Sequence, residues 1–138
     1  MGVGRNRNVG HSFERDCVKK FKLAGFEHVA TSRLVNRSRD NEKVDLANSN
    51  ELAQGRFPYN VQCKSVTGTL NYVKHLHSLE VIPGIRNVVL HRKTEKKPEN
   101  TNFMVTGRYA FLYFEDFMEM VAEIEHLKSI VNGQGSTD

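Results

Sequence analysis

Apolar residues recur at three- and four-residue spacing near each end of the chain. The first series follows Ser12, a favourable helix N-cap, and stops at Gly25; it comprises Phe13, Cys17, Val18, Phe21 and Ala24. The second series lies within residues 115–131; it comprises Phe117, Met120, Val121, Ile124, Leu127 and Ile130 or Val131. Each series predicts an amphipathic helix with one face buried against a core.

Between these helices the pattern favours strands. Alternating or continuous apolar residues predict strands in four places: residues 26–33, 43–47, 59–65 and 87–91. Asn71 is positioned to cap a helix over 72–80, and 92–100 is typical of an exposed connection. Residues 103–105 and 109–114 flank Gly107 as two strands or a bent hairpin. The order α-β-β-β-α-β-β-α predicts an α/β fold with a mixed sheet flanked by helices.

The length and the composition of the chain ends predict the domain organisation. A chain of 138 residues is enough for one domain. Residues 1–9, rich in glycine and arginine, are expected to form a flexible basic arm before a single domain over 10–131. Residues 132–138 are expected to form a disordered tail.

Charge is distributed unevenly along the chain. Residues 1–39 carry nine Lys and Arg against three acids, whereas residues 115–138 carry one Lys against six acids. A basic first third is typical of a surface that binds a polyanion, because neutralising phosphates releases counterions. A solvated charged face is the alternative interpretation.

Several other function classes find no support in the sequence. No apolar run reaches the roughly 18 residues of a membrane span, and the first residues lack a signal-peptide core, so we expect a cytoplasmic, nucleic-acid-associated protein that is not secreted. Cys17 and Cys63 are expected to be buried small apolar residues. His75 and His77 cannot face one ligand from a helix, and His91 is expected on a solvated face. Neither a phosphate-binding glycine loop nor a small-molecule cofactor site is indicated.

The polar positions of two predicted strands suggest a specific chemistry. Asp45 interrupts an apolar strand, and Gln62 and Lys64 share the outward row of the next strand with Asn60. Carboxylate and amide oxygens suit Mg²⁺, and a lysine can orient the attacking water or neutralise a phosphate. Glu14 on the first helix could complete the set, although a carboxylate is also favourable near a helix N-terminus for structural reasons. Lys64 could equally be an edge-strand charge that prevents aggregation.

Together these residues resemble a known family. Its pattern is matched by Glu14, then Gly25-Phe26, Ser32-Arg33, Val44-Asp45-Leu46 and Val61-Gln62-Cys63-Lys64-Ser65. The series is similar to the PD-(D/E)XK nuclease superfamily, and most of all to its archaeal-type Holliday-junction resolvases, over roughly residues 10–92. The resemblance implies a restriction-endonuclease-like fold and a homodimer that cuts four-way DNA junctions with Mg²⁺, for which Mn²⁺ can substitute.

The resemblance also implies roles for individual residues. Glu14, Asp45, Gln62 and the backbone carbonyl of Cys63 would hold the metal, and Lys64 would position water. The resemblance further implies that Ser32 and Arg33 contact DNA or support the site. The basic composition predicts phosphate contacts to branched or duplex DNA from Arg5, Arg7, Arg33, Arg37 and Arg39.

Gln62 departs from the family pattern, which has an acid at this position. A neutral amide oxygen makes the site one unit less negative and weakens Mg²⁺ binding. Three interpretations therefore remain at this point: an active junction endonuclease, a catalytically weak or inert DNA-binding module, and a nuclease of the same superfamily that acts on other DNA.

Overall fold

The computed structural model describes residues 2–32, 44–48, 57–99 and 102–135. Its elements follow the predicted order. The helices are α1 (Gly2–Leu23), α4 (Tyr72–His77) and α5 (Phe114–Gly135). The strands are β1 (Val29–Thr31), β2 (Leu46–Asn48), β3 (Tyr59–Thr67), β4 (Arg86–Lys96) and β5 (Phe103–Leu112).

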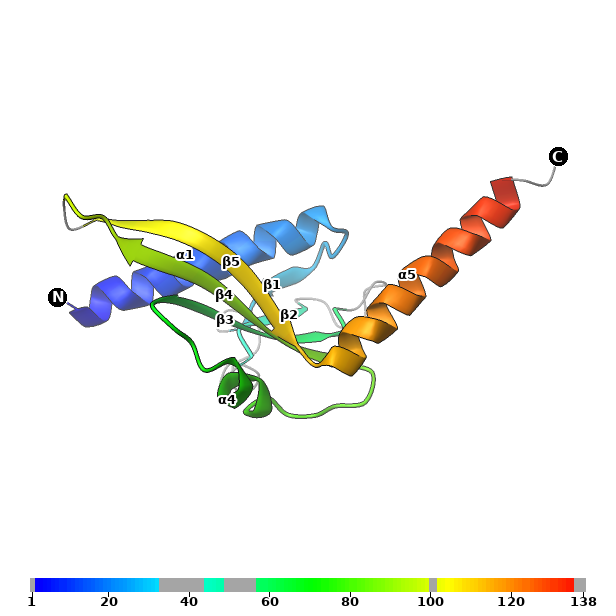
Figure 1. The fold of residues 1–138 in the computed structure, drawn as a ribbon, viewed down its shortest axis with the longest axis horizontal. Helices are drawn as coiled ribbons and strands as arrows, with labels where there is room; N and C mark the ends of the chain where they lie inside the picture. The colour runs from blue at the N-terminus through cyan, green and yellow to red at the C-terminus, as the bar shows by residue number, and fades with distance from the viewer. Residues whose placement is uncertain (1, 33–43, 49–56, 100–101, 136–138) are drawn as a thin grey trace.

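The strands form one five-stranded sheet in the order β1-β2-β3-β4-β5. β3 and β4 are parallel over nine residue pairs, and every other neighbouring pair is antiparallel. The crossover between β3 and β4 contains α4, as a parallel connection requires. The α/β class with a mixed, helix-flanked sheet is therefore confirmed, and Figure 1 shows α1 and α4 beside this sheet.

The two faces of the sheet are packed differently. Val61 and Cys63 of β3 point toward α1 and join Phe13, Cys17 and nearby apolar side chains in the core. Because side chains alternate along a strand, the flanking residues of β3 point to the other face, where α4 lies. On that face Asn60 donates from Nδ2 to Asn87 Oδ1 at 2.9 Å, and Leu76 of α4 is buried.

Helix α1 begins earlier than predicted. It starts at Gly2, so residues 2–9 are helical and the expected irregular arm over 1–9 is wrong for them. Phe13 and Cys17 anchor the helix to the sheet, and extending an anchored helix costs far less than nucleating one. At its other end Gly25 takes φ 117°, which confirms the predicted stop.

Strands β4 and β5 are longer than the pattern indicated. β4 continues to Lys96 through the predicted connection, because Thr94 pairs with β3 on one side and β5 on the other. β5 runs unbroken past Gly107, and a register shift opposite Lys93 and Thr94 absorbs the irregularity. Gly107 is required because a Cβ there would collide with the ring of Tyr109.

Helix α5 has the predicted apolar stripe but not the predicted burial. Most of its large apolar side chains are exposed, and Phe117, Ile124 and Leu127 are at least half exposed. The helix also extends to Gly135, so the tail expected from residue 132 begins no earlier than 136. Figure 1 shows α5 projecting from the sheet. Among the described residues no helix is both long and apolar enough to cross a membrane.

Candidate functional site

The first component of the site is Asp45, which is fixed at the edge of β3. β2 pairs with β3 only at Leu46 and Val61. Just before this pair, the Asp45 N–H donates to the Val61 carbonyl at 2.7 Å, and the Asp45 carbonyl accepts from the Ser32 N–H at 2.8 Å. The Asp45 carboxylate accepts from the Cys63 N–H at 2.6 Å through Oδ2. The Asp45 carboxylate thus accepts the Cys63 N–H in place of a backbone carbonyl from a neighbouring strand, at the point where the pairing of β2 with β3 ends.

This position explains why an aspartate is tolerated there. The Cys63 N–H points to the edge of β3 that faces β2, but β2 does not pair with β3 at this residue. A buried backbone donor must still find an acceptor. The Asp45 carboxylate provides it, and each carboxylate oxygen can accept more than one bond. Since the N–H and C=O of one strand residue point to the same edge, the Cys63 carbonyl also faces Asp45's side of β3.

Glu14 reaches the same region from α1. Cys63 lies in the core beside Cys17, and the hydrogen bond between their side chains, followed by burial, raises the pKa of the Cys63 thiol well above 9.0. The negative charges of Asp45 and Glu14 raise this pKa further. Both carboxylates therefore lie close enough to Cys63 to act on one thiol. The thiol stays protonated at neutral pH, so Cys63 can offer a metal its carbonyl oxygen rather than a thiolate.

Gln62 and Lys64 occupy the opposite face of β3 from Cys63. Gln62 is only 4% exposed, and its Oε1 has no hydrogen-bond partner among the described residues. A buried polar atom without a partner is rare in native proteins and calls for an explanation such as a ligand or ion. Lys64 is half-buried and pairs in register with His91 of β4.

The candidate donors for a hard divalent cation come from both faces of β3, because Cys63 faces α1 and the Gln62 side chain faces the opposite side. Glu14 and Asp45 contribute carboxylates, and Gln62 and Cys63 contribute neutral oxygens. Oxygen donors of this kind are what Mg²⁺ and Mn²⁺ prefer, and the orphaned Gln62 oxygen fits the role of a ligand. Within the described residues no three His, Cys, Asp or Glu side chains group as a metal site; the proposed set has two such carboxylates.

The predicted DNA-contacting residues divide into three groups. Ser32 is fully buried beside Asp45, so it can support the site but cannot meet DNA at the surface. Arg5 and Arg7 lie on the first turns of α1, where the backbone alone is described. Arg33, Arg37 and Arg39 lie outside the described residues.

A basic hollow beside α1 was missed by the sequence analysis. Arg15, Lys19 and Lys22 of α1 line it together with Thr31 of β1, and it encloses about 470 Å³. The three basic residues are spaced four and three apart, so they share one helix face. That spacing was the available signal, and it places the three cations on one face of α1, beginning at the residue after Glu14.

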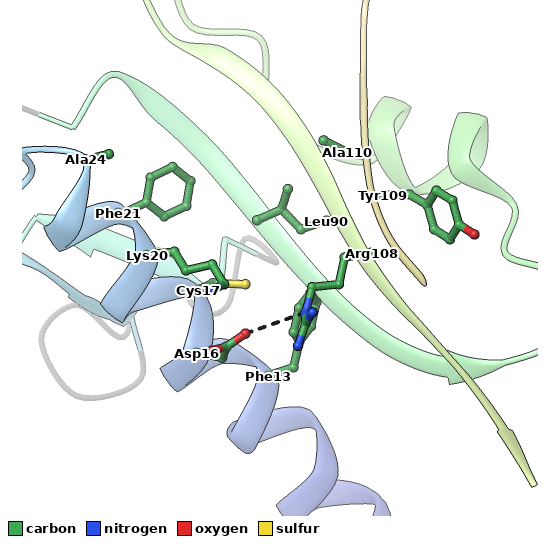
Figure 2. Close-up of a pocket in the computed structure, with 10 residues that line it drawn as sticks. All are labelled: Phe13, Asp16, Cys17, Lys20, Phe21, Ala24, Leu90, Arg108, Tyr109 and Ala110. Atoms are coloured by element: carbon green, nitrogen blue, oxygen red, sulfur yellow. Dashed lines mark ion pairs between the residues drawn. The ribbon is translucent and has the colours of Figure 1, made fainter. Parts of the chain in front are cut away.

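A second hollow lies between α1 and β5 and is almost entirely apolar. It has a volume of about 350 Å³ and is lined in part by Phe13, Phe21 and Leu90. Figure 2 shows Asp16 of α1 paired with Arg108 of β5 at its margin, at 3.8 Å. None of its lining residues belongs to the proposed metal site.

His91 is not on a solvated face as predicted. It is 1% exposed, next to Lys64 in the sheet. Its Nδ1 lies 2.6 Å from the Tyr72 hydroxyl and its Nε2 lies 3.4 Å from the Val66 carbonyl. Because a carbonyl can only accept, Nε2 donates and Nδ1 accepts from Tyr72 in the neutral ring. His91 is buried because β4 is an interior strand of the sheet and α4 covers it.

We expect His91→Ala to destabilise the protein by about 2–4 kcal/mol, since it removes a buried ring and leaves the Tyr72 hydroxyl without its acceptor. Tyr72→Phe should cost less, about 1 kcal/mol, because the ring remains. Urea unfolding followed by circular dichroism measures both changes. Equal stability of the wild type and His91→Ala would contradict the buried placement.

Comparison with known protein families, with curated proteins and with solved structures finds no match to this chain.

Proposed function

We propose that this protein is a metal-dependent DNA endonuclease with a restriction-endonuclease-like fold, most similar in its site to Holliday-junction resolvases. The observation that supports the proposal is the Asp45 carboxylate, which accepts from the Cys63 N–H at 2.6 Å between the positions of Gln62 and Lys64 on β3, on the strand that packs against Glu14's helix α1. The order of elements and the mixed sheet support the fold.

The residues divide the reaction between them. Glu14, Asp45, Gln62 and the Cys63 carbonyl would hold Mg²⁺ or Mn²⁺, which supplies Lewis-acid stabilisation of the phosphoryl oxygens and a more acidic water. Lys64 would orient the attacking water and offset negative charge on the phosphate. The water oxygen bonds to phosphorus, the bond from phosphorus to one ester oxygen breaks, and that oxygen takes up a proton. Asp45 is already held in place by the Cys63 N–H, so little reorganisation is needed.

DNA would approach along the basic side of α1. Arg15, Lys19 and Lys22 offer cations beside Glu14, and Arg5 and Arg7 extend the same helix toward its start. Contacts of this type bind phosphates without reading bases, so we expect recognition by DNA shape and salt-sensitive affinity. A four-way junction has two strands to cut symmetrically, which favours a homodimer with two sites.

The experiment that tests the proposal is cleavage of a labelled four-way junction with Mg²⁺, with Mn²⁺ and with EDTA, beside linear duplex of the same sequence. Paired metal-dependent nicks near the crossover support a resolvase. Equal cutting of linear duplex would instead indicate a non-junction nuclease. A mobility shift without cleavage in either metal contradicts the nuclease proposal.

The neutral Gln62 favours a second candidate, a DNA-binding module with weak or no cleavage. Gln62→Glu distinguishes the two, because it adds a negative charge to the donor set. For an active enzyme we expect the Mg²⁺ concentration at half-maximal cleavage to fall on the order of tenfold. For an inert module, cleavage should appear only in the variant.

Gln62→Met is the matched control, since it keeps the size of the side chain and removes the oxygen. It should raise the Mg²⁺ requirement while leaving DNA binding in EDTA unchanged. If the Met and Glu variants both show the metal dependence of the wild type, Gln62 is not a ligand.

A further inference from the structure

Helix α5 presents an apolar surface that the described part of the chain does not cover. Eight large apolar side chains on it are substantially exposed: Phe114, Phe117, Met118, Val121, Ile124, Leu127, Ile130 and Val131. Monomeric proteins rarely expose a continuous apolar patch of this extent without a binding role.

The central part of this surface has a specific spacing. Phe117, Met120, Ile124, Leu127 and Val131 follow one another at intervals of three, four, three and four residues. We call these five residues the α5 seam. This is the a/d pattern of helices that pack against other helices, and no charged residue interrupts it.

The polar side of α5 narrows the choice of partner. It carries five acids and one lysine: Glu115, Asp116, Glu119, Glu123, Glu125 and Lys128. A helix that binds DNA or an anionic membrane carries Lys and Arg on its polar side, so neither surface suits α5. An apolar seam bordered by acids instead suits another protein helix.

Two charged contacts attach the acidic side of α5 to the sheet. Arg86 of β4 donates to Glu123 at 2.8 Å and lies 3.5 Å from Glu119. This hydrogen bond with Glu123 is the main cause of the raised pKa of Arg86. With α5 attached in this way, the seam residues Phe117, Ile124, Leu127 and Val131 remain exposed. Figure 1 shows the helix itself projecting from the sheet.

We propose that the α5 seam packs against the α5 seam of a second copy of this chain, with the two helices antiparallel. A two-fold axis pairs one surface with itself, and the seam is self-complementary because it is apolar throughout. Covering the five seam side chains would remove on the order of 400 Å² of apolar surface per chain, about half of the roughly 800 Å² per partner of a standard specific interface, so the seam would form the centre of a larger contact.

The antiparallel direction follows from charge. The acids of α5 gather in its first twelve residues, between Glu115 and Glu125, and the remaining ten residues have only Lys128 as a charged residue. Parallel helices would place two acidic halves side by side, whereas antiparallel helices set each acidic half beside the weakly charged half of its partner.

The test is the mass of the full chain in solution, measured by size exclusion with light scattering at about 50 µM, above the Kd of a typical specific interface. We expect twice the chain mass of 15.8 kDa. Ile124→Glu should give the monomer mass, and Ile124→Ala should weaken the dimer at least tenfold in Kd without introducing a charge. Ala122→Glu, on the polar side of α5, should remain a dimer. Circular dichroism checks that each variant folds.

Further variants distinguish the antiparallel seam-to-seam dimer from a dimer that uses the apolar hollow and from a parallel pair of helices. Ala110→Glu places a charge in the hollow between α1 and β5 and should leave the dimer intact. Spin labels on cysteines introduced at Ala122, near the middle of the seam along the helix axis, should lie much closer to each other than labels at Glu115, near its start. Similar distances at both positions would mean parallel helices and overturn the proposal.

Other outcomes also overturn it. A monomeric wild type would mean that α5 folds back or binds a different protein. A dimer that survives Ile124→Glu would place the interface elsewhere. Dissociation by Ala110→Glu would mean that α5 of one copy enters the hollow of the other. The mass is measured without DNA or metal. The dimer proposal can therefore fail while cleavage persists, and the nuclease proposal can fail while the dimer persists.

Discussion

Asp45→Asn should reduce metal-dependent cleavage of a four-way junction by about 10³-fold or more. The change replaces an anionic oxygen with a neutral amide, and loss of a metal ligand removes several kcal/mol of transition-state stabilisation, each 1.36 kcal/mol being about tenfold in rate. The remaining amide oxygen can still accept from the Cys63 N–H, so the fold should persist. Single-turnover cleavage measures the rate, and a gel shift in EDTA measures DNA affinity, which should change by less than about threefold.

Asp16→Asn is the matched control. Asp16 is also on the sheet side of α1, but its carboxylate pairs with Arg108 and not with the proposed metal site. Cleavage by this variant should stay near the wild-type rate. The account is wrong about Asp45 if Asp45→Asn cleaves within tenfold of the wild type, or if both aspartate variants lose activity equally.

Lys64→Ala should slow the chemical step by about 10²–10³-fold, in the range expected when a group that positions or activates water is removed. Lys64 is half-buried on the same face of β3 as Gln62, and it pairs in register with His91 of β4. We expect the loss in kcat with little change in KM, because phosphate binding is spread over other cations. Lys64→Arg should recover only part of the rate, since a guanidinium differs in shape and acidity.

Lys93→Ala serves as the control for Lys64→Ala. Lys93 lies on the neighbouring strand β4, where it pairs with Glu95 at 3.8 Å. A rise in KM at unchanged kcat for Lys64→Ala would show that Lys64 only binds phosphate. No kinetic change at all would show that it is an edge-strand charge.

Local pattern predicted much of the fold. The apolar spacing after Ser12 located α1 on the sheet, and Asn71 was correctly assigned as an N-cap, accepting from the Lys74 N–H at 3.1 Å. Boundaries were less accurate, because helix extension to Gly2 and strand extension to Lys96 depend on anchoring by distant residues. Periodicity also showed that one face of α5 is apolar, but it carries no information on what covers that face.

The candidate site also combines features that the local sequence predicted with features that depend on residues distant along the chain. Asp45 stood out in the sequence because aspartate is unfavourable in a strand, and the structure supplies the reason in the Cys63 N–H. His91 was misplaced because its partner Tyr72 lies 19 residues away along the chain and only the fold brings the two together. The unsatisfied Gln62 oxygen likewise becomes visible only once burial is known.

The central claim is that Glu14 and Asp45 hold one divalent cation at β3, although they come from separate elements. Mn²⁺ titration followed by electron paramagnetic resonance, which detects free Mn²⁺, tests it most directly. We predict one site per chain in the wild type, at least tenfold weaker binding in Glu14→Gln, and wild-type binding in the exposed control Glu27→Gln. Wild-type protein that binds no Mn²⁺, or Glu14→Gln that binds it as tightly as the wild type, would contradict the account.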